Sequence, residues 1–249
     1  MVTSESSGAP VDTEQPREKK QLPLWQETIL LLVVALGLAI LIKALLVQAF
    51  YIPSESMEPG LVKNDRILVQ KVSYWFGGTP QRGDVIVFKD PGDWLSGSDA
   101  AGPPNAVTQL MAKIGLYPSG GHLVKRVIGV GGDVIHCCDE QGRIEVNGVP
   151  LNEKDYARLD GAECYGPMIG CHWTTDRVPE GTVFVMGDNR SHSADSTVHM
   201  CRGGSDCVPG EEFVPVDLVV GKVFVVLWPR SHFRWLQRPD TFADVPDAS

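Results

Sequence analysis

Residues 29–47, ILLLVVALGLAILIKALLV, determine the architecture of the chain. These nineteen residues carry one charge, Lys43, and no other polar side chain. A helix of this length spans roughly 30 Å at about 1.5 Å per residue, which matches the hydrocarbon core of a bilayer. Lys43 lies about one turn from the outer end, where its ammonium can reach the polar interface. We therefore predict one transmembrane anchor helix over residues 25–49.

Basic residues before this segment predict its orientation. Arg17, Lys19 and Lys20 precede the apolar run closely, and an excess of arginine and lysine marks the cytoplasmic side of a membrane helix. Residues 1–24 are rich in Ser, Glu, Pro and Lys, which is typical of a disordered tail. The sequence thus predicts a single-pass protein of the plasma membrane, with a cytoplasmic N-terminus and the rest of the chain extracytoplasmic.

A cleavable signal peptide is the alternative interpretation of the same segment, with Val47, Gln48 and Ala49 forming a small-residue cleavage site. The apolar run is longer than the usual 7–15 or so residues of such a peptide, and Lys43 interrupts it near its end. Both features favour a retained anchor. A mature N-terminus at Phe50 would contradict it.

The six cysteines all follow the apolar segment and are Cys137, Cys138, Cys164, Cys171, Cys201 and Cys207. An even number of cysteines outside the cytoplasm predicts disulfides. Pairing Cys164 with Cys171, and Cys201 with Cys207, would close two short loops. Because six cysteines allow about 15 connectivities, the pairing stays open.

Composition limits the classes of partner. The chain is 43% hydrophobic and 21% charged, as in ordinary globular proteins, and its net charge is −9 with no basic cluster after the first twenty residues. This charge argues against nucleic acid as a partner. No C-x-x-C or paired Cys/His spacing indicates a metal site, so we predict no metal and no cofactor.

Beyond the anchor, short β-like runs alternate with turn residues. They occupy residues 66–72, 84–88, 123–130, 133–136, 143–146, 182–186 and 219–227. The pattern predicts a mainly β extracytoplasmic domain over residues 50–234. Residues 90–121, rich in Gly, Pro and Ser with a short helix expected at 106–114, indicate an insertion, and residues 235–249 a polar C-terminal tail.

Few familiar catalytic patterns are present. The sequence contains no H-E-x-x-H and no G-x-S-x-G. A Ser-His-Asp triad stays open, because such residues meet only in the fold. A Ser-Lys dyad is the other option: Lys125 shares a strand face with Leu123 and Val127, where burial would lower its pKa. A solvated lysine on a strand is the commoner case.

Three segments occur in order behind the anchor: residues 52–59 (IPSESMEP), 123–133 (LVKRVIGVGGD) and 187–196 (GDNRSHSADS). This combination resembles the type I signal peptidases of bacteria, the leader peptidase family, over roughly residues 28–230. The resemblance implies a membrane-anchored serine endopeptidase with an antiparallel β-sheet domain. Such enzymes need no cofactor and remove N-terminal signal peptides from exported preproteins after small residues.

The resemblance also implies roles for single residues. Ser56 matches the nucleophile, Lys125 the general base, and Ser54 a hydroxyl that joins the Ser56 amide in the oxyanion hole. The supporting residues that it implies are Ser193, which orients the lysine, Asp188 and Asp195 as acids, and Arg126 as the partner of Asp188. The residues matched to small-side-chain pockets are Ile52, Pro53, Met57, Leu61 and Val124.

One position departs from the family pattern. Where that pattern has an arginine two residues after the second acid, this chain has Thr197. A salt bridge of Asp195 would then require Arg190 or Arg202.

Two other classes of protein share some of these features. A LexA-type self-cleaving protease also uses a Ser-Lys dyad, but would need a DNA-binding region in place of the anchor. A non-catalytic, membrane-tethered binding or assembly protein would keep the β domain alone. The predicted partners are signal peptides and the lipid bilayer, into which Tyr74, Trp75 and Phe76 are expected to dip; the oligomeric state stays open.

Overall fold

The computed structural model describes residues 23–75, 77–92, 94–95, 105–108, 120–159, 172–201 and 208–248. Several predictions fall on residues outside these ranges. They concern the tail over residues 1–22, most of the insertion at 90–121, and the side chains of Phe76, Cys164, Cys171, Arg202 and Cys207.

The N-terminal apolar segment forms helix α1 (Leu24–Leu46). Within the described part of the chain it is the one helix long and apolar enough to cross a membrane, over Leu24–Ile42. The chain divides into two compact units, Met1–Leu41 and Ile42–Ser249. The helix stops at Leu46, earlier than predicted, because residues 47–49 pair with strand β2 as part of strand β1.

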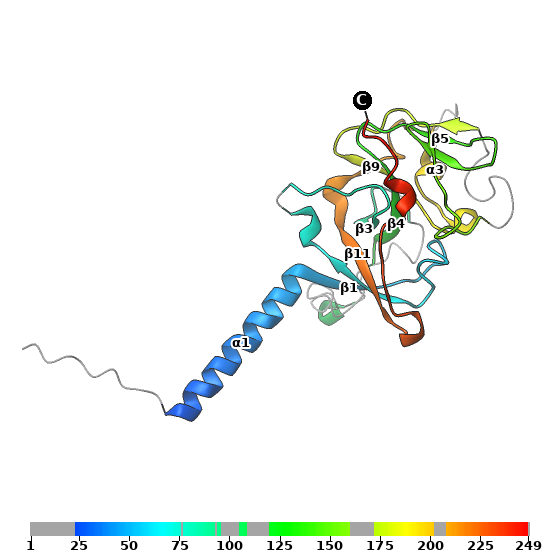
Figure 1. The fold of residues 1–249 in the computed structure, drawn as a ribbon. Coiled ribbons are helices and arrows are strands. Elements are labelled where there is room, and N and C mark those ends of the chain that lie inside the picture. The colour runs from blue at the N-terminus through cyan, green and yellow to red at the C-terminus, as the bar shows by residue number, and fades with distance from the viewer. Residues whose placement is uncertain are drawn as a thin grey trace, which may run out of the picture. The chain divides into compact units, whose positions relative to one another are not determined.

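The larger sheet is antiparallel throughout and, among the described residues, has eight strands. Seven follow the order β1-β2-β11-β3-β4-β9-β10, and β12 pairs with β11 (Figure 1). Their bounds are β1 (Val47–Tyr51), β2 (Arg66–Gln70), β3 (Val85–Lys89), β4 (His122–Val130), β9 (Thr182–Met186), β10 (Val214–Pro215), β11 (Val219–Trp228) and β12 (Arg234–Trp235). The predicted mainly β fold is confirmed.

A second, antiparallel sheet has the order β7-β6-β5-β8 within the described ranges. Its strands are β5 (Ile135–Cys137), β6 (Ile144–Val146), β7 (Val149–Pro150) and β8 (Trp173–Thr174). Short helices connect the strands: η1 (Val72–Tyr74), η3 (Arg190–His192), α3 (Ser196–His199), η4 (Val216–Leu218), η5 (Arg230–His232) and η6 (Asp240–Phe242). The seven predicted runs all correspond to strands, whereas two-residue strands are too short to show an alternating pattern.

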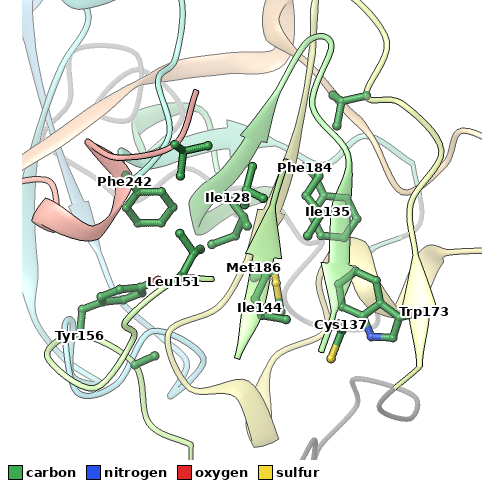
Figure 2. Packing of buried hydrophobic residues seen from close by; sticks show 14 of the residues in the cluster. Ile128, Ile135, Cys137, Ile144, Leu151, Tyr156, Trp173, Phe184, Met186 and Phe242 are labelled. Carbon is green, nitrogen blue, oxygen red and sulfur yellow. The ribbon is translucent and has the colours of Figure 1, made fainter. Parts of the chain in front are cut away.

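Apolar side chains from both sheets form the core. One cluster joins Ile128 and Phe184 of the large sheet to Ile135 and Ile144 of the small one (Figure 2). A second cluster packs Ile52, Met57 and Leu61 against strands β2, β3 and β11. This second cluster fixes the segment that contains Ser54 and Ser56.

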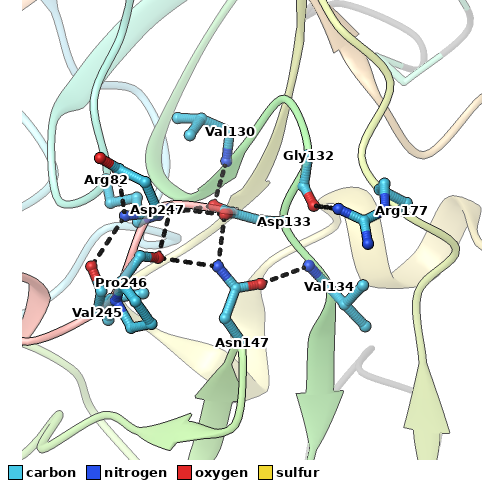
Figure 3. Close-up of polar contacts among 10 residues, drawn as sticks. All are labelled: Arg82, Val130, Gly132, Asp133, Val134, Asn147, Arg177, Val245, Pro246 and Asp247. Atoms are coloured by element: carbon cyan, nitrogen blue, oxygen red, sulfur yellow. Dashed lines mark hydrogen bonds and ion pairs between the residues drawn. The ribbon is translucent and has the colours of Figure 1, made fainter. Parts of the chain in front are cut away.

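The C-terminal segment is part of the core, so its interpretation as a polar tail was wrong. Phe242 and Val245 are each 6% exposed and belong to the first cluster. Arg82 donates hydrogen bonds to the Val245 and Pro246 carbonyls, both at 3.2 Å, and forms an ion pair with buried Asp133 (Figure 3). Two apolar residues in a short run give no periodic pattern, which is why the sequence did not reveal this packing.

The three cysteines that the structure describes, Cys137, Cys138 and Cys201, are all disulfide-bonded. Cys137 and Cys138 form a disulfide at the end of β5, a pairing that the sequence did not suggest. Cys201 is disulfide-bonded. Its predicted pairing with Cys207, like that of Cys164 with Cys171, stays a prediction, because those partners lie outside the described residues.

Phe242→Ala should lower the free energy of unfolding by about 3–5 kcal/mol, because it opens a cavity in the first core cluster. Chemical denaturation of the full chain in detergent measures the change. Phe233→Ala is the matched control, since Phe233 is 53% exposed and its loss should cost less than about 0.5 kcal/mol. Equal effects of the two substitutions would contradict the packing of the C-terminal segment.

Candidate active site

The segment that carries Ser54 and Ser56 is held at both ends. Ile52 donates its amide to the Asp65 carbonyl at 2.9 Å, and the Leu61 amide donates to the Met57 carbonyl at 2.7 Å. The side chains of Ile52, Met57 and Leu61 are at most 2% exposed. Because these apolar anchors are fixed in the core, the serines between them have little freedom to move.

Ser54 and Ser56 point toward each other. Their hydroxyl oxygens are 3.2 Å apart and hydrogen bonded, and either one can donate. Ser54 is exposed, whereas Ser56 is 8% exposed. The predicted pair of hydroxyls is therefore assembled at the surface of the domain, with Ser56 on its inner side.

Asn189 fixes the backbone on both sides of Ser56. Its amide N–H donates to the Ser56 carbonyl at 3.0 Å, and its side-chain Nδ2 donates to the Glu55 carbonyl at 3.1 Å. The Glu55 carbonyl shares a planar peptide group with the Ser56 N–H, and the two point in opposite directions in a trans peptide. Asn189 thus sets the direction of the Ser56 N–H, although the sequence did not single it out.

Lys125 lies in strand β4, paired with Ile86 of β3, and is 4% exposed. Within the described residues, no hydrogen bond or ion pair joins its ammonium to another side chain. Burial lowers the pKa of Lys125 to about 8, against the opposing charges of Asp195 and Asp188. The lowered pKa brings the neutral amine within reach near neutral pH. Lys125 is therefore not the solvated strand lysine of the commoner case.

Asp195 is held by hydrogen bonds. Its Oδ2 accepts from the Ser193 hydroxyl at 2.6 Å and from the Gly187 amide at 2.8 Å. Its Oδ1 accepts from the Thr197 amide at 3.1 Å and from the Thr197 hydroxyl at 2.8 Å. Thr197, which stands where the resemblance leads us to expect an arginine, therefore contacts Asp195 through hydrogen bonds. Arg190 does not replace this arginine, because its ion pair is with Glu153.

Asp188 pairs with Arg126, as predicted. The guanidinium donates two hydrogen bonds to the carboxylate, each 2.7 Å, and a third to the Gly83 carbonyl. Arg126 is 4% exposed and Asp188 is fully buried. A paired and hydrogen-bonded geometry of this kind is what a buried ion pair requires. It ties the strand of Lys125 to the loop after β9.

Gly187 permits close packing at the centre of the site. A Cβ atom at this position would lie 2.2 Å from the Ser193 hydroxyl oxygen and 2.5 Å from the Ser56 carbonyl oxygen. Such contacts are impossible for a real side chain, so only glycine fits here. The structure thus brings together the Ser56 segment and the 187–195 segment, which lie far apart in sequence.

The predicted pocket residues divide into two groups. Ile52, Met57 and Leu61 are buried in the second core cluster, where they support the site from within. Val124 is only partly buried and packs against this cluster, and Pro53 is exposed. Val124 and Pro53 therefore offer the accessible surface.

Among the residues that the structure describes, no group of three or more His, Cys, Asp or Glu is arranged to bind a metal ion. The polar groups described at the site are hydroxyl, amine, amide and carboxylate groups.

Comparison with known proteins gives the family. The profile described as "Signal peptidase, peptidase S26" matches residues 25–228. The chain belongs to this family. It is therefore a serine endopeptidase, and the non-catalytic alternative loses its support.

Named relatives agree with this assignment. "Signal peptidase I" of Mycobacterium tuberculosis is 40% identical over 247 residues, which covers 93% of this chain and 81% of the relative. "Probable signal peptidase I" of Mycobacterium leprae is 38% identical over 254 residues, covering 94% and 85%. A crystal structure of a signal peptidase I from Enterococcus faecalis aligns with TM-score 0.33 and 23% identity, over 57% of this chain and 95% of that one.

Lys125 should titrate near pH 8. Asp195→Asn should lower the pKa of Lys125 further, because of the two carboxylates that raise this pKa, Asp195 has the larger effect. NMR titration of protein labelled with 13C-lysine measures both values. Glu212→Gln removes a buried carboxylate outside the site and should leave the Lys125 titration unchanged. A Lys125 pKa above 10 would contradict the desolvation argument.

Proposed function

We propose that the protein is a membrane-anchored signal peptidase that cleaves exported preproteins by a Ser56–Lys125 dyad. The observation that carries this proposal is the buried Lys125, whose pKa is lowered to about 8, in a chain of the signal peptidase family with a paired Ser54 and Ser56. A lysine whose pKa is lowered by burial toward neutral pH can act as a general base. No observation favours a self-cleaving regulator.

Acylation begins with Lys125 in its neutral form. The amine takes the proton of the Ser56 hydroxyl while the Ser56 oxygen bonds to the scissile carbonyl carbon. The resulting ammonium then gives this proton to the leaving nitrogen, and the carbon–nitrogen bond breaks. The mature protein leaves with a new N-terminal amine, and the signal peptide stays esterified to Ser56.

Deacylation repeats the same proton transfers with water. Neutral Lys125 takes a proton from water as the water oxygen attacks the ester carbon, and it returns the proton to Ser56 as the ester bond breaks. In both steps the carbonyl oxygen becomes negative. The Ser56 N–H and the Ser54 hydroxyl are the donors proposed to stabilise it, and one such donor typically contributes on the order of 3 kcal/mol.

The choice of substrate follows from the surface beside Ser56. Val124 and Pro53 present limited apolar surface over a densely packed cluster, so the site is proposed to accept small side chains before the scissile bond. Overpacking a closed apolar layer typically costs about 1–3 kcal/mol, which supports rejection of bulky residues.

Attachment to the plasma membrane is proposed to occur through α1, with the catalytic domain on the extracytoplasmic side. Ser56 follows Leu46 by ten residues, so an extended chain could place it no more than about 35 Å from the end of the helix. A signal peptide whose apolar segment ends at the same surface presents its cleavage site at a similar height.

A second membrane contact is proposed at the β11–β12 hairpin. Its exposed apolar residues are Leu227, Trp228, Phe233 and Trp235, between 46% and 64% exposed. Trp75 is 40% exposed, and the proposal for the 74–76 segment rests on it alone. Tyr74 packs against a core cluster and donates its hydroxyl to buried Asp84 at 3.2 Å, so the expectation that it dips into the membrane was wrong. Amphipathic aromatic rings of this kind favour the membrane interface.

Ser56→Ala and Lys125→Ala should each abolish cleavage of a preprotein, and Ser54→Ala should lower kcat about 100-fold through loss of one oxyanion donor. The measurement is gel-resolved processing of a preprotein by purified full-length enzyme. Ser73→Ala and Lys89→Ala, both at exposed positions, are the matched controls and should retain full activity. Substantial cleavage by Ser56→Ala or Lys125→Ala would rule out the dyad.

The variant with Trp228→Ser and Trp235→Ser should cleave a preprotein in proteoliposomes several-fold more slowly, yet cleave a soluble peptide at the normal rate. The reason is that these rings contribute to the membrane contact and not to the chemistry. Val208→Ser, which alters an apolar residue that is 57% exposed elsewhere, is the control. If the variant cleaved the preprotein in proteoliposomes as fast as wild type does, the membrane contact would be contradicted.

A further inference from the structure

The segment that follows β7, residues 153–158, connects both halves of the active site. Ala157 forms an isolated antiparallel β-bridge with Pro59, at the end of the segment that carries Ser54 and Ser56. The Arg158 amide donates to the Asp188 carbonyl at 2.8 Å, and the Arg158 carbonyl accepts from the Arg190 amide at 3.2 Å. Residues 153–158 thus lie against the two segments that meet at Ser56.

A buried ion pair fixes this segment to the loop after β9. Glu153 and Arg190 are 4% and 3% exposed, and Glu153 Oε1 lies 2.8 Å from Arg190 Nη2. Among the described residues, the Arg190 side-chain nitrogens have no other polar partner than this ion pair. Glu153 therefore supplies the countercharge that keeps this guanidinium buried.

Tyr156 joins this pair to the Arg126 pair. Its hydroxyl donates to Glu153 Oε1 at 3.0 Å, and its ring lies 4.5 Å below the Arg126 guanidinium carbon. Burial and the charge of Glu153 raise the pKa of Tyr156, so its hydroxyl stays a donor. The same ring packs at the border of the first core cluster (Figure 2).

Four buried charges thus balance in two pairs, Arg126 with Asp188 and Arg190 with Glu153. Removing one partner of a buried pair leaves the other charge uncompensated, and the surrounding chain must move to solvate it. Asn189 lies in the chain between Asp188 and Arg190, one member of each ion pair. Its hydrogen bonds orient the peptide groups on both sides of Ser56. A displacement of the loop would therefore turn the Ser56 N–H.

We propose that Glu153 is a positioning residue for the reaction. Through Arg190, with Tyr156 as its second contact, Glu153 keeps Asn189 in position. The hydrogen bonds of Asn189 then direct the Ser56 N–H at the developing oxyanion. The proposal rests on the function proposed above. It assigns a role to a residue outside the three segments that carry the family resemblance. Glu153 does not touch the substrate, so its loss should change turnover and not substrate binding.

Glu153→Gln should lower kcat about tenfold or more with KM within twofold, because small misplacements of catalytic groups are costly. The assay is preprotein cleavage by the full-length enzyme, at a temperature where thermal unfolding shows the variant folded. Glu212→Gln is the matched control: Glu212 is 6% exposed, but its carboxylate accepts from Gly210 and not from the active-site loops. A kcat within twofold of wild type for Glu153→Gln, or an equal loss for Glu212→Gln, overturns the proposal.

A double-mutant cycle tests the route through Arg190. Arg190→Gln alone should also lower kcat, and the variant with both substitutions should lose no more than the worse single variant. Additive losses would show that Glu153 does not act through Arg190 and would overturn the proposal.

Tyr156→Phe keeps the ring over Arg126 and removes one hydrogen bond, so it should fold even where Glu153→Gln does not. It should lower kcat several-fold with KM unchanged; a kcat equal to wild type in that case overturns the proposal. Residual cleavage by Ser56→Ala would contradict the dyad instead, so the two failures are distinguishable.

Discussion

The buried ion pair of Arg126 and Asp188 is the constraint on which the site depends. Arg126 follows Lys125 directly in β4, so a fixed guanidinium also fixes the backbone of the lysine. The Asp188 carboxylate also approaches the segment that carries Ser56, since a Cβ at Gly60 would lie 2.8 Å from Asp188 Oδ2. Three segments that are distant in sequence are thus assembled around one carboxylate.

The cost of burying these charges is linked to the chemistry of Lys125. Desolvation disfavours its ammonium, while Asp188 and Asp195 favour it. Both carboxylates are already engaged, Asp188 by Arg126 and Asp195 by the donors of Ser193, Gly187 and Thr197. Desolvation therefore outweighs the two negative charges, and the lysine can lose its proton near neutral pH.

Residues with a repeating pattern or a family motif were predictable from the sequence. Strands such as β4 and β11 are long enough to show their apolar character, and the apolar length of α1 marks it as a span. The roles of Ser56, Lys125 and Asp188 came from the family resemblance, because spacing alone left Lys125 an ordinary strand lysine. Its burial became visible only with both neighbouring strands, β3 and β9, in place.

Other features depended on contacts that no local pattern records. Phe242 and Val245 enter the core although their surroundings are polar, and β1 begins directly after the helix because β2 supplies its partners. Glu153 lies in a polar stretch of sequence, and such stretches are equally typical of loops exposed to solvent. Its importance follows from Arg190, a countercharge 37 positions away in sequence that only the fold brings to it.

Thr197 stands where the family resemblance leads us to expect an arginine, and this difference bears on the charge near Asp195. An arginine at this position would bring a positive charge close to Asp195 and cancel much of its field. Thr197 supplies two hydrogen bonds to the same carboxylate without adding net charge. The negative charge of Asp195 is therefore not neutralised by Thr197, and it raises the pKa of Lys125. Because that charge favours the ammonium, the pKa of Lys125 falls to about 8 only because burial outweighs it.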